Sequence, residues 1–195
     1  LGSANVLGAV TGASGAGAVY LTENDAIAIA EITRTDGDLT LSAGSNAITQ
    51  SGAIAVDDGV VSLTGGAITL GSANVLGAVT VASGAGAISL TENDAIAIAG
   101  ITRTDGDLTL NAGSNAITQS GVIAVDDGAV SLTGGAITLG SANVLGVVNI
   151  SSTGANDVAL TDSAALDLGT VTVSQNLSLS ATGAITDSGV VTVSG

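Results

Sequence analysis

The chain has 195 residues, of which 46% are apolar, but nearly all of these are Ala, Val, Ile and Leu, and Tyr20 is the single aromatic residue. Seventeen acidic residues against Arg34 and Arg103 give a formal net charge of −15. Such a surface repels phosphate backbones and anionic lipid, which excludes nucleic-acid binding, and the absence of cysteine excludes a disulfide framework. The aliphatic content excludes an intrinsically disordered chain, so we expect a thin core of small side chains.

A long internal repeat organises the whole sequence. The string LGSANVLG begins at Leu1, Leu70 and Leu139, and residues 1–69 and 70–138 differ at only seven positions. Residues 139–195 form a partial and more divergent third copy. We therefore predict one repeat domain over residues 1–195, which is a segment of a longer chain.

Short apolar–polar–apolar triplets follow one another within each copy, and this alternation is typical of strands with one buried face. Gly, Asn and Asp separate them, as in SGAG, TDGD and VDDG, and these residues suit tight corners. The triplets fall into three series, each with a spacing of about 22 residues. In chain order, the triplets of the first copy are centred on Thr11, Tyr20, Ala28, Thr33, Thr40, Thr49, Ala55, Ser62 and Thr69.

This pattern predicts an all-β fold, a parallel β-helix (β-solenoid) with three short strands per turn. We expect about 8–9 turns of ~22 residues, three turns in each 69-residue unit, with each strand pairing with its equivalent one turn later. The usual hand of parallel crossover connections favours a right-handed coil. A β-sandwich is the alternative, but it does not explain one period kept in three separate series.

Acidic corners are the candidate metal sites. Asp36 and Asp58 follow equivalent strands on neighbouring turns, as do Asp105 and Asp127, so their carboxylates should stack. Two carboxylates about 5 Å apart repel each other, and a bound Ca²⁺ would relieve that repulsion. The alternative is that these residues are solvated turn formers, so we assign no metal site and keep Ca²⁺ as a weaker possibility.

Arg34 and Arg103 stand at strand ends where neighbouring turns carry an inward-facing valine. Because a buried unpaired arginine is costly, we expect each side chain to leave the core at the corner. Arg34 would then pair with Asp36 or Asp58, and Arg103 with Asp105 or Asp127.

The remaining polar residues predict no catalytic site. The chain has no His, Lys or Cys, so it offers no nucleophile with an adjacent base, and we expect neither an enzyme nor a cofactor. Rows of outward Thr and Ser are typical of a solvated sheet face, because threonine favours strands. An ordered array that binds ice is the alternative, but Ala, Asn, Asp and Tyr interrupt the rows.

The segment GANDVALTDSAALDLGTVTVSQNLSLSATGAITDSG (154–189), like GDLTLNAGSNAITQSG (106–121), resembles the repeats of filamentous-haemagglutinin-like exoproteins. Proteins of this family are large bacterial surface adhesins exported by two-partner secretion, and their repeats form right-handed parallel β-helices. The resemblance therefore implies a right-handed solenoid outside the cell. It covers only the family's stalk, since nothing in the chain matches the family's N-terminal secretion domain.

The leading functional hypothesis is a structural stalk segment of a secreted bacterial cell-surface adhesin, without catalysis and without membrane insertion. Its partners would be neighbouring segments of the same long chain, together with possible host-cell or bacterial-surface receptors. A self-assembling extracellular fibre or sheath subunit, joined end to end, is one alternative. A direct glycan- or protein-binding module, using GSANVLG or the corner near Tyr20, is another.

Overall fold

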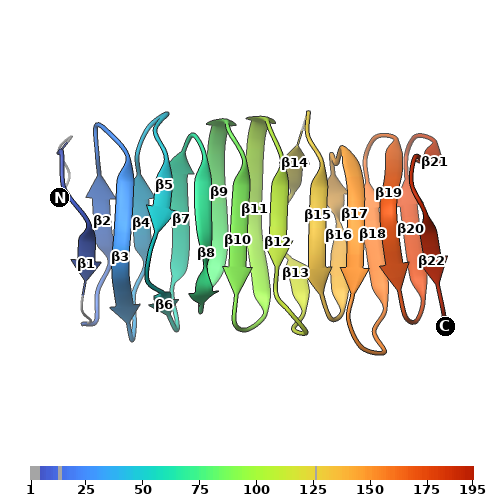
Figure 1. Cartoon of the computed structure of the whole chain (residues 1–195), viewed down its shortest axis with the longest axis horizontal. Helices are drawn as coiled ribbons and strands as arrows, with labels where there is room; N and C mark the ends of the chain where they lie inside the picture. Colours follow the sequence, from blue (N-terminus) through green and yellow to red (C-terminus); the bar gives the residue numbers. More distant parts are fainter. Residues whose placement is uncertain (1–4, 13–14, 126) are drawn as a thin grey trace.

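The computed structural model describes residues 5–12, 15–125 and 127–195. In these residues the regular secondary structure consists of parallel strands, without helices. The strands form two sheets that run the length of a rod, with β1 (Val10–Gly12) at one end and β22 (Val191–Val193) at the other (Figure 1). The first sheet contains β1 (Val10–Gly12), β3 (Ile27–Arg34), β5 (Ile48–Gln50), β6 (Ile54–Val56), β8 (Ile68–Asn74), β10 (Ile88–Glu92), β12 (Leu108–Asn111), β15 (Val130–Gly134), β17 (Val147–Ser152), β19 (Leu166–Val173), β21 (Ile185–Asp187) and β22 (Val191–Val193). The second contains β2 (Val19–Thr22), β4 (Leu39–Ser42), β7 (Val60–Gly65), β9 (Ala78–Ala85), β11 (Ile96–Asp105), β13 (Ile117–Gln119), β14 (Ile123–Val125), β16 (Ile137–Asn143), β18 (Val158–Asp162) and β20 (Leu177–Ala181).

The chain passes alternately through the two sheets, and this winding confirms the predicted β-solenoid. Each strand pairs in parallel with a strand about 20 residues later, as in the run Tyr20, Thr40, Ser62 and Thr80. The described residues complete about nine turns. Some turns contain three short strands, such as β5, β6 and β7, whereas others contain two longer ones, such as β8 and β9.

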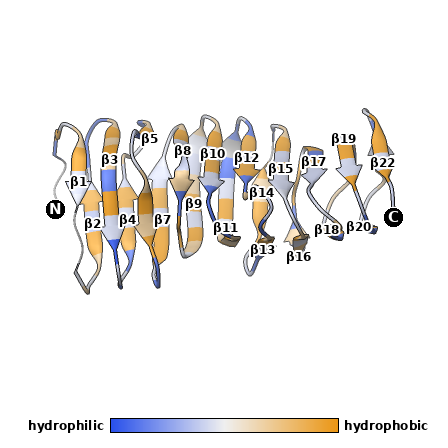
Figure 2. Ribbon diagram, turned by 60° about the horizontal axis from the view of Figure 1, so that its bottom comes forward, coloured by the Kyte–Doolittle hydropathy of each residue, from blue (hydrophilic) through white to orange (hydrophobic). Residues whose placement is uncertain are grey.

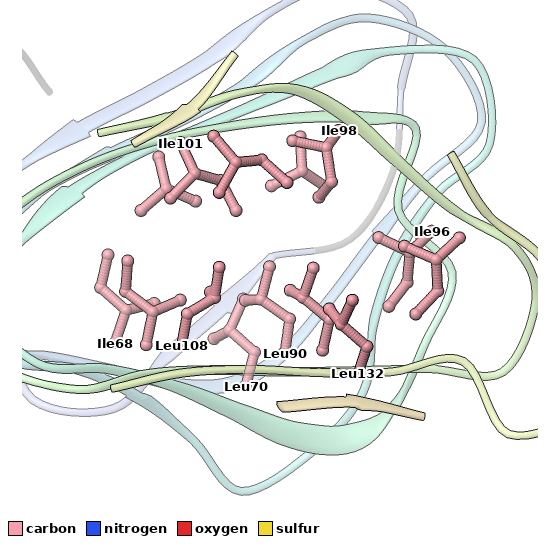
Figure 3. Close-up of a cluster of buried hydrophobic side chains, with 14 of the residues drawn as sticks. Ile68, Leu70, Leu90, Ile96, Ile98, Ile101, Leu108 and Leu132 are labelled. Atoms are coloured by element: carbon pink, nitrogen blue, oxygen red, sulfur yellow. The ribbon is translucent and has the colours of Figure 1, made fainter. Parts of the chain in front are cut away.

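The core lies between the two sheets and is made of aliphatic side chains that alternate with outward polar ones. In Figure 3, Ile68, Leu70 and Leu90 of the first sheet face Ile98 and Ile101 of the second. All five are at most 1% exposed. Apolar segments recur on strand after strand along the rod (Figure 2), so every turn buries its side chains against the next. Stability therefore comes from stacking rather than from one central core.

One 69-residue copy occupies about three and a half turns, because each turn takes about 20 residues. Equivalent strands of successive copies consequently lie in opposite sheets. The long strands β3, β11 and β19, which begin at Ile27, Ile96 and Leu166, belong to the first, second and first sheet respectively. This arrangement revises the expected three turns per unit.

The pairing of strands also departs from the three expected series of triplets. The centre Ser62 pairs with Thr80 of another series, and Thr69 likewise pairs with Ser89. The switch occurs around GSANVLG (71–77), where β8 extends through Asn74 and the register with β10 shifts. This segment adds length to the strand and the following corner, and so moves the next copy half a turn around the rod.

Glycines permit the turns to stack closely at one corner. A Cβ added at Gly128 would collide with the carbonyl oxygen of Gly106 on the preceding turn. Gly106 itself has a φ of 101°, which L-residues with side chains rarely adopt. The TDGD and VDDG strings thus place glycine where two backbones approach each other.

Candidate functional site

The four aspartates proposed as calcium candidates lie at exposed corners. Asp36 and Asp58 are on neighbouring turns, as expected, because Arg34 pairs with Val56. Asp105 and Asp127 are related in the same way. Within the described residues, no group of three or more Asp, Glu, His or Cys side chains could hold a metal ion. The geometry therefore adds no support to calcium binding.

A different aspartate in each corner joins consecutive turns. Asp38 accepts a hydrogen bond from the backbone N–H of Val60 at 2.9 Å, and Asp107 accepts one from Ala129 at the same distance. Both partners lie 22 residues further along the chain. These carboxylates satisfy backbone donors that would otherwise have only water at the corner.

The two arginines are buried, which contradicts the expectation that they leave the core. Arg34 is 7% exposed and Arg103 is 1% exposed. The Arg103 guanidinium donates to the carbonyl oxygens of Gly86, Asp105 and Asp107, the last at 2.8 Å. Corner carbonyls therefore take the place of the expected carboxylates. Burial lowers the pKa of Arg103, although the charges of Asp107 and Asp105 oppose this shift.

The most elaborate polar arrangement is buried beside GSANVLG, and we call it the Asn74 corner: Gln50, Asn74, Leu76, Glu92 and Asp94. The Asn74 side chain is fully buried and forms two hydrogen bonds with the Gln50 amide, at 2.8 and 2.9 Å. Its Oδ1 also accepts from the N–H of Ile54, and its Nδ2 donates to the carbonyl of Thr91. One side chain thus connects three consecutive turns.

Glu92 completes this corner from the following turn. Its Oε2 accepts a hydrogen bond from the Leu76 N–H at 3.0 Å, and the side chain is 5% exposed. Burial raises the pKa of Glu92 to about 8, because the charged form loses its hydration; the hydrogen bond from Leu76 opposes the shift, and neighbouring Asp94 adds to it.

An equivalent Asn143 corner, one copy later and in the other sheet, contains Gln119, Asn143, Leu145, Asp162 and Ala164. Asn143 exchanges two hydrogen bonds with Gln119, both at 2.8 Å. The N–H of Leu145 donates to Asp162 Oδ2 at 2.9 Å. The N–H of Ala164 donates to Asp162 Oδ1 at 2.6 Å, so both carboxylate oxygens have a donor.

These corners were not identified as sites from the sequence, although the strand alternation carried a signal. In β8 every second residue points inward. Ile68, Leu70 and Asn74 are buried, and the inward position between Leu70 and Asn74 is half-buried. The same parity turns Glu92 inward after Ile88 and Leu90. Polar residues at inward positions of a repeat therefore mark a buried network.

The outward faces carry mainly small hydroxyl and amide side chains. On the first sheet, one row of register partners contains Thr49, Thr69, Ser89, Thr109, Ser131 and Asn149. Tyr20 is 58% exposed and lines a hollow near the N-terminal end with Leu7, Val10 and Arg34. The described residues form no helix long and apolar enough to span a membrane.

Comparison with protein-family models places these features in a repeat family. The model described as Repeats of unknown function (DUF5649) matches residues 16–83, 85–151 and 155–195. The chain belongs to this family. Its matches begin anew about once per 69-residue copy, in agreement with the repeat seen in the sequence. Comparison with curated proteins and with solved structures gave no significant match.

Proposed function

We propose that the chain is a structural stalk segment of a large secreted bacterial surface adhesin of the filamentous-haemagglutinin-like type. In this role it holds a binding region away from the cell and performs no catalysis. The observation that carries the proposal is the way in which near-identical copies stack. Residues 1–69 and 70–138 differ at seven positions, and their strands continue the same two sheets without a break.

Such a repeat produces length. Parallel strands are spaced by about 4.8 Å, so three and a half turns add roughly 17 Å to the rod. Each added copy buries its own aliphatic residues against the preceding turn, and the stability of the rod does not require a new core design. A gene duplication therefore lengthens the stalk directly.

The surface chemistry also suits an extracellular rod. The net charge of −15 makes rods repel one another, which opposes clumping. The fold contains no cysteine and so does not depend on oxidative folding after export. The sequence of residues 154–189 resembles filamentous-haemagglutinin-like repeats, and this resemblance supports the assignment of the stalk to an adhesin of that type.

The first test is the location of the protein on cells that produce it. Antibodies against residues 1–195, used for immunogold electron microscopy of intact cells, should label fibres at a distance from the envelope. Deleting one 69-residue copy from the gene should shorten the stalk by roughly 17 Å, so the gold label at its outer end should lie closer to the envelope by that distance. Label confined to the cytoplasm would refute the proposal.

A further inference from the structure

Two carboxyl groups of the Asn74 corner have buried oxygen atoms that no donor among the described residues reaches. Glu92 Oε1 and Asp94 Oδ1 are both buried without a hydrogen-bond partner, although Glu92 Oε2 accepts from Leu76. Asp94 lies two residues after Glu92, and a side-chain hydrogen bond with Asp94 is among the causes that raise the pKa of Glu92. The same pair of unpartnered oxygens recurs one copy earlier, at Glu23 and Asp25.

Within the described residues, both arginines donate to backbone carbonyls, and no positive charge contributes to the pKa of Glu92. The strand on one side presents Asn74 in register with it, and the strand on the other presents Asn111 beside the adjoining Thr91. The corner backbone contributes the Leu76 N–H. Among the described residues, Asp94 is therefore the ionisable group that faces Glu92. Two ionised carboxylates in this position would repel each other at low dielectric.

We propose that Glu92 and Asp94 hold one proton between them, and that this shared proton closes the Asn74 corner in acidic and neutral surroundings and releases it in alkaline ones. The proton supplies the donor that the two buried oxygens lack. Its loss leaves two repelling charges in the corner that ties three turns together. The rod then opens locally at residues 74–77 while its other turns stay stacked.

The Asn143 corner shows what the same position looks like without a shared proton. Ala164 replaces the second carboxyl, and the N–H groups of Leu145 and Ala164 supply a donor to each oxygen of Asp162. A carboxylate that accepts two backbone hydrogen bonds is stable when ionised. This corner therefore has no reason to open as the pH rises.

The direction of the pH effect follows from the number of protons that the closed and the open corner bind. Glu92 has a pKa of about 8 in the closed corner and an ordinary value of 4.5 when the corner is open. Between these values the closed corner binds more protons than the open one, so closure weakens as the pH rises. The opening constant should rise by up to about tenfold per pH unit in this window and level off above it.

The test is amide hydrogen exchange of the 195-residue chain between pH 5 and pH 9, read by NMR as protection factors so that the intrinsic pH dependence is removed. The Leu76 amide should lose protection by up to about tenfold per pH unit below pH 8. The Leu145 amide, in the same molecule, should keep its protection. A carboxyl-carbon titration should place Glu92 near 8.

Two variants sharpen the test. Glu92→Gln should remove the pH dependence at Leu76. The double variant Glu92→Asp with Asp94→Ala copies the Asn143 corner, and it should also make Leu76 insensitive to pH; it keeps the proposal testable if the glutamine variant does not fold. Parallel loss of protection at Leu76 and Leu145, or titration of Glu92 near its ordinary value, would overturn the proposal. Strengthened protection of Leu76 on addition of calcium at pH 8 would also overturn it, because a cation would then be the partner.

Discussion

The Asn74 and Asn143 corners have the same framework but different carboxyl chemistry. In both, a buried asparagine pairs with a glutamine of the preceding turn, and an acid from the following turn accepts a leucine N–H. At Asn74 the acid is Glu92 beside Asp94, and two oxygens lack donors. At Asn143 the acid is Asp162, and both oxygens have donors.

The difference shows which parts of a repeat can drift. The asparagine persists in the divergent third copy, where Asn143 still joins three consecutive turns, whereas the position of Gln50 and Gln119 holds Asp187 there. The acid became shorter, and its neighbour became alanine. The leucine N–H therefore requires a carboxyl acceptor in both corners, whereas the residue two positions after that acid is free to change.

The largest effect is expected when the shared asparagine is removed. Asn74→Ala leaves the Ile54 N–H without its buried acceptor and removes a donor from the Thr91 carbonyl and from Gln50 Oε1. The Gln50 amide keeps its hydrogen bonds with Gly52 and Ser72. Each unsatisfied buried group costs about 1–3 kcal/mol, so we expect a loss of about 3 kcal/mol or more in the free energy of unfolding.

Urea denaturation measures this loss, and Asn143→Ala should match it. The control is Asn115→Ala, which removes an exposed side chain with a 3.2 Å hydrogen bond to the Asn93 carbonyl. An Asn74→Ala loss no larger than that of the control would show that the corner does not hold the turns together.

Arg103→Val gives the second copy the residue that the third copy has at the equivalent position, Val173. The carbonyls of Gly86, Asp105 and Asp107 would lose the guanidinium donor. We expect a loss of about 2 kcal/mol in the free energy of unfolding. Arg103→Met retains an apolar stem without the donors and separates the two contributions. Wild-type stability in the methionine variant would assign the role of Arg103 to its stem.

The reverse graft should transfer pH sensitivity to the Asn143 corner. Asp162→Glu with Ala164→Asp recreates the carboxyl pair of Glu92 and Asp94, and the new glutamate should acquire a pKa above its ordinary value. Because the folded state then retains a proton that the unfolded state has lost, stability should fall as the pH rises toward 8. Urea denaturation at pH 5 and pH 8 measures the change. A variant with the same pH profile as the parent chain would show that the pair alone is insufficient.

The smallest effect is expected on the outer faces. Thr109→Val changes an exposed hydroxyl on β12 into a methyl group of similar shape and strand preference. Its effect on the free energy of unfolding should stay within about 0.5 kcal/mol in the same denaturation experiment. A larger loss would indicate that the hydroxyl rows contribute to stability as well as to solvation.

The solenoid itself could be predicted because alternation and period are properties of single residues and their spacing. The partner of each strand could not be predicted in the same way. Ser62 sits in a triplet that resembles those around both Thr80 and Ser89, so composition does not choose between them. The choice depends on how much chain the corners consume, and that length is set by the three-dimensional path around GSANVLG.

The arginines illustrate a second difficulty. The sequence predicted that each arginine leaves the core and pairs with an aspartate, whereas Arg103 stays buried in a corner that supplies three carbonyl oxygens from two turns. Those carbonyls become available only where turns stack, so no local pattern reveals them. The inward parity of Glu92 and Asn74, by contrast, was readable from the alternation alone.

The half-turn left over in each copy has a geometric consequence for a rod built from this repeat. Successive copies are related by a twofold screw operation, a rotation of half a circle combined with an advance of roughly 17 Å. Curvature produced by one copy is cancelled by the next, which faces the other way. Identical groups return to the same side only after two copies, about 34 Å along the axis. Such a rod is straight, and the same side chains lie on one side of it in one copy and on the opposite side in the next.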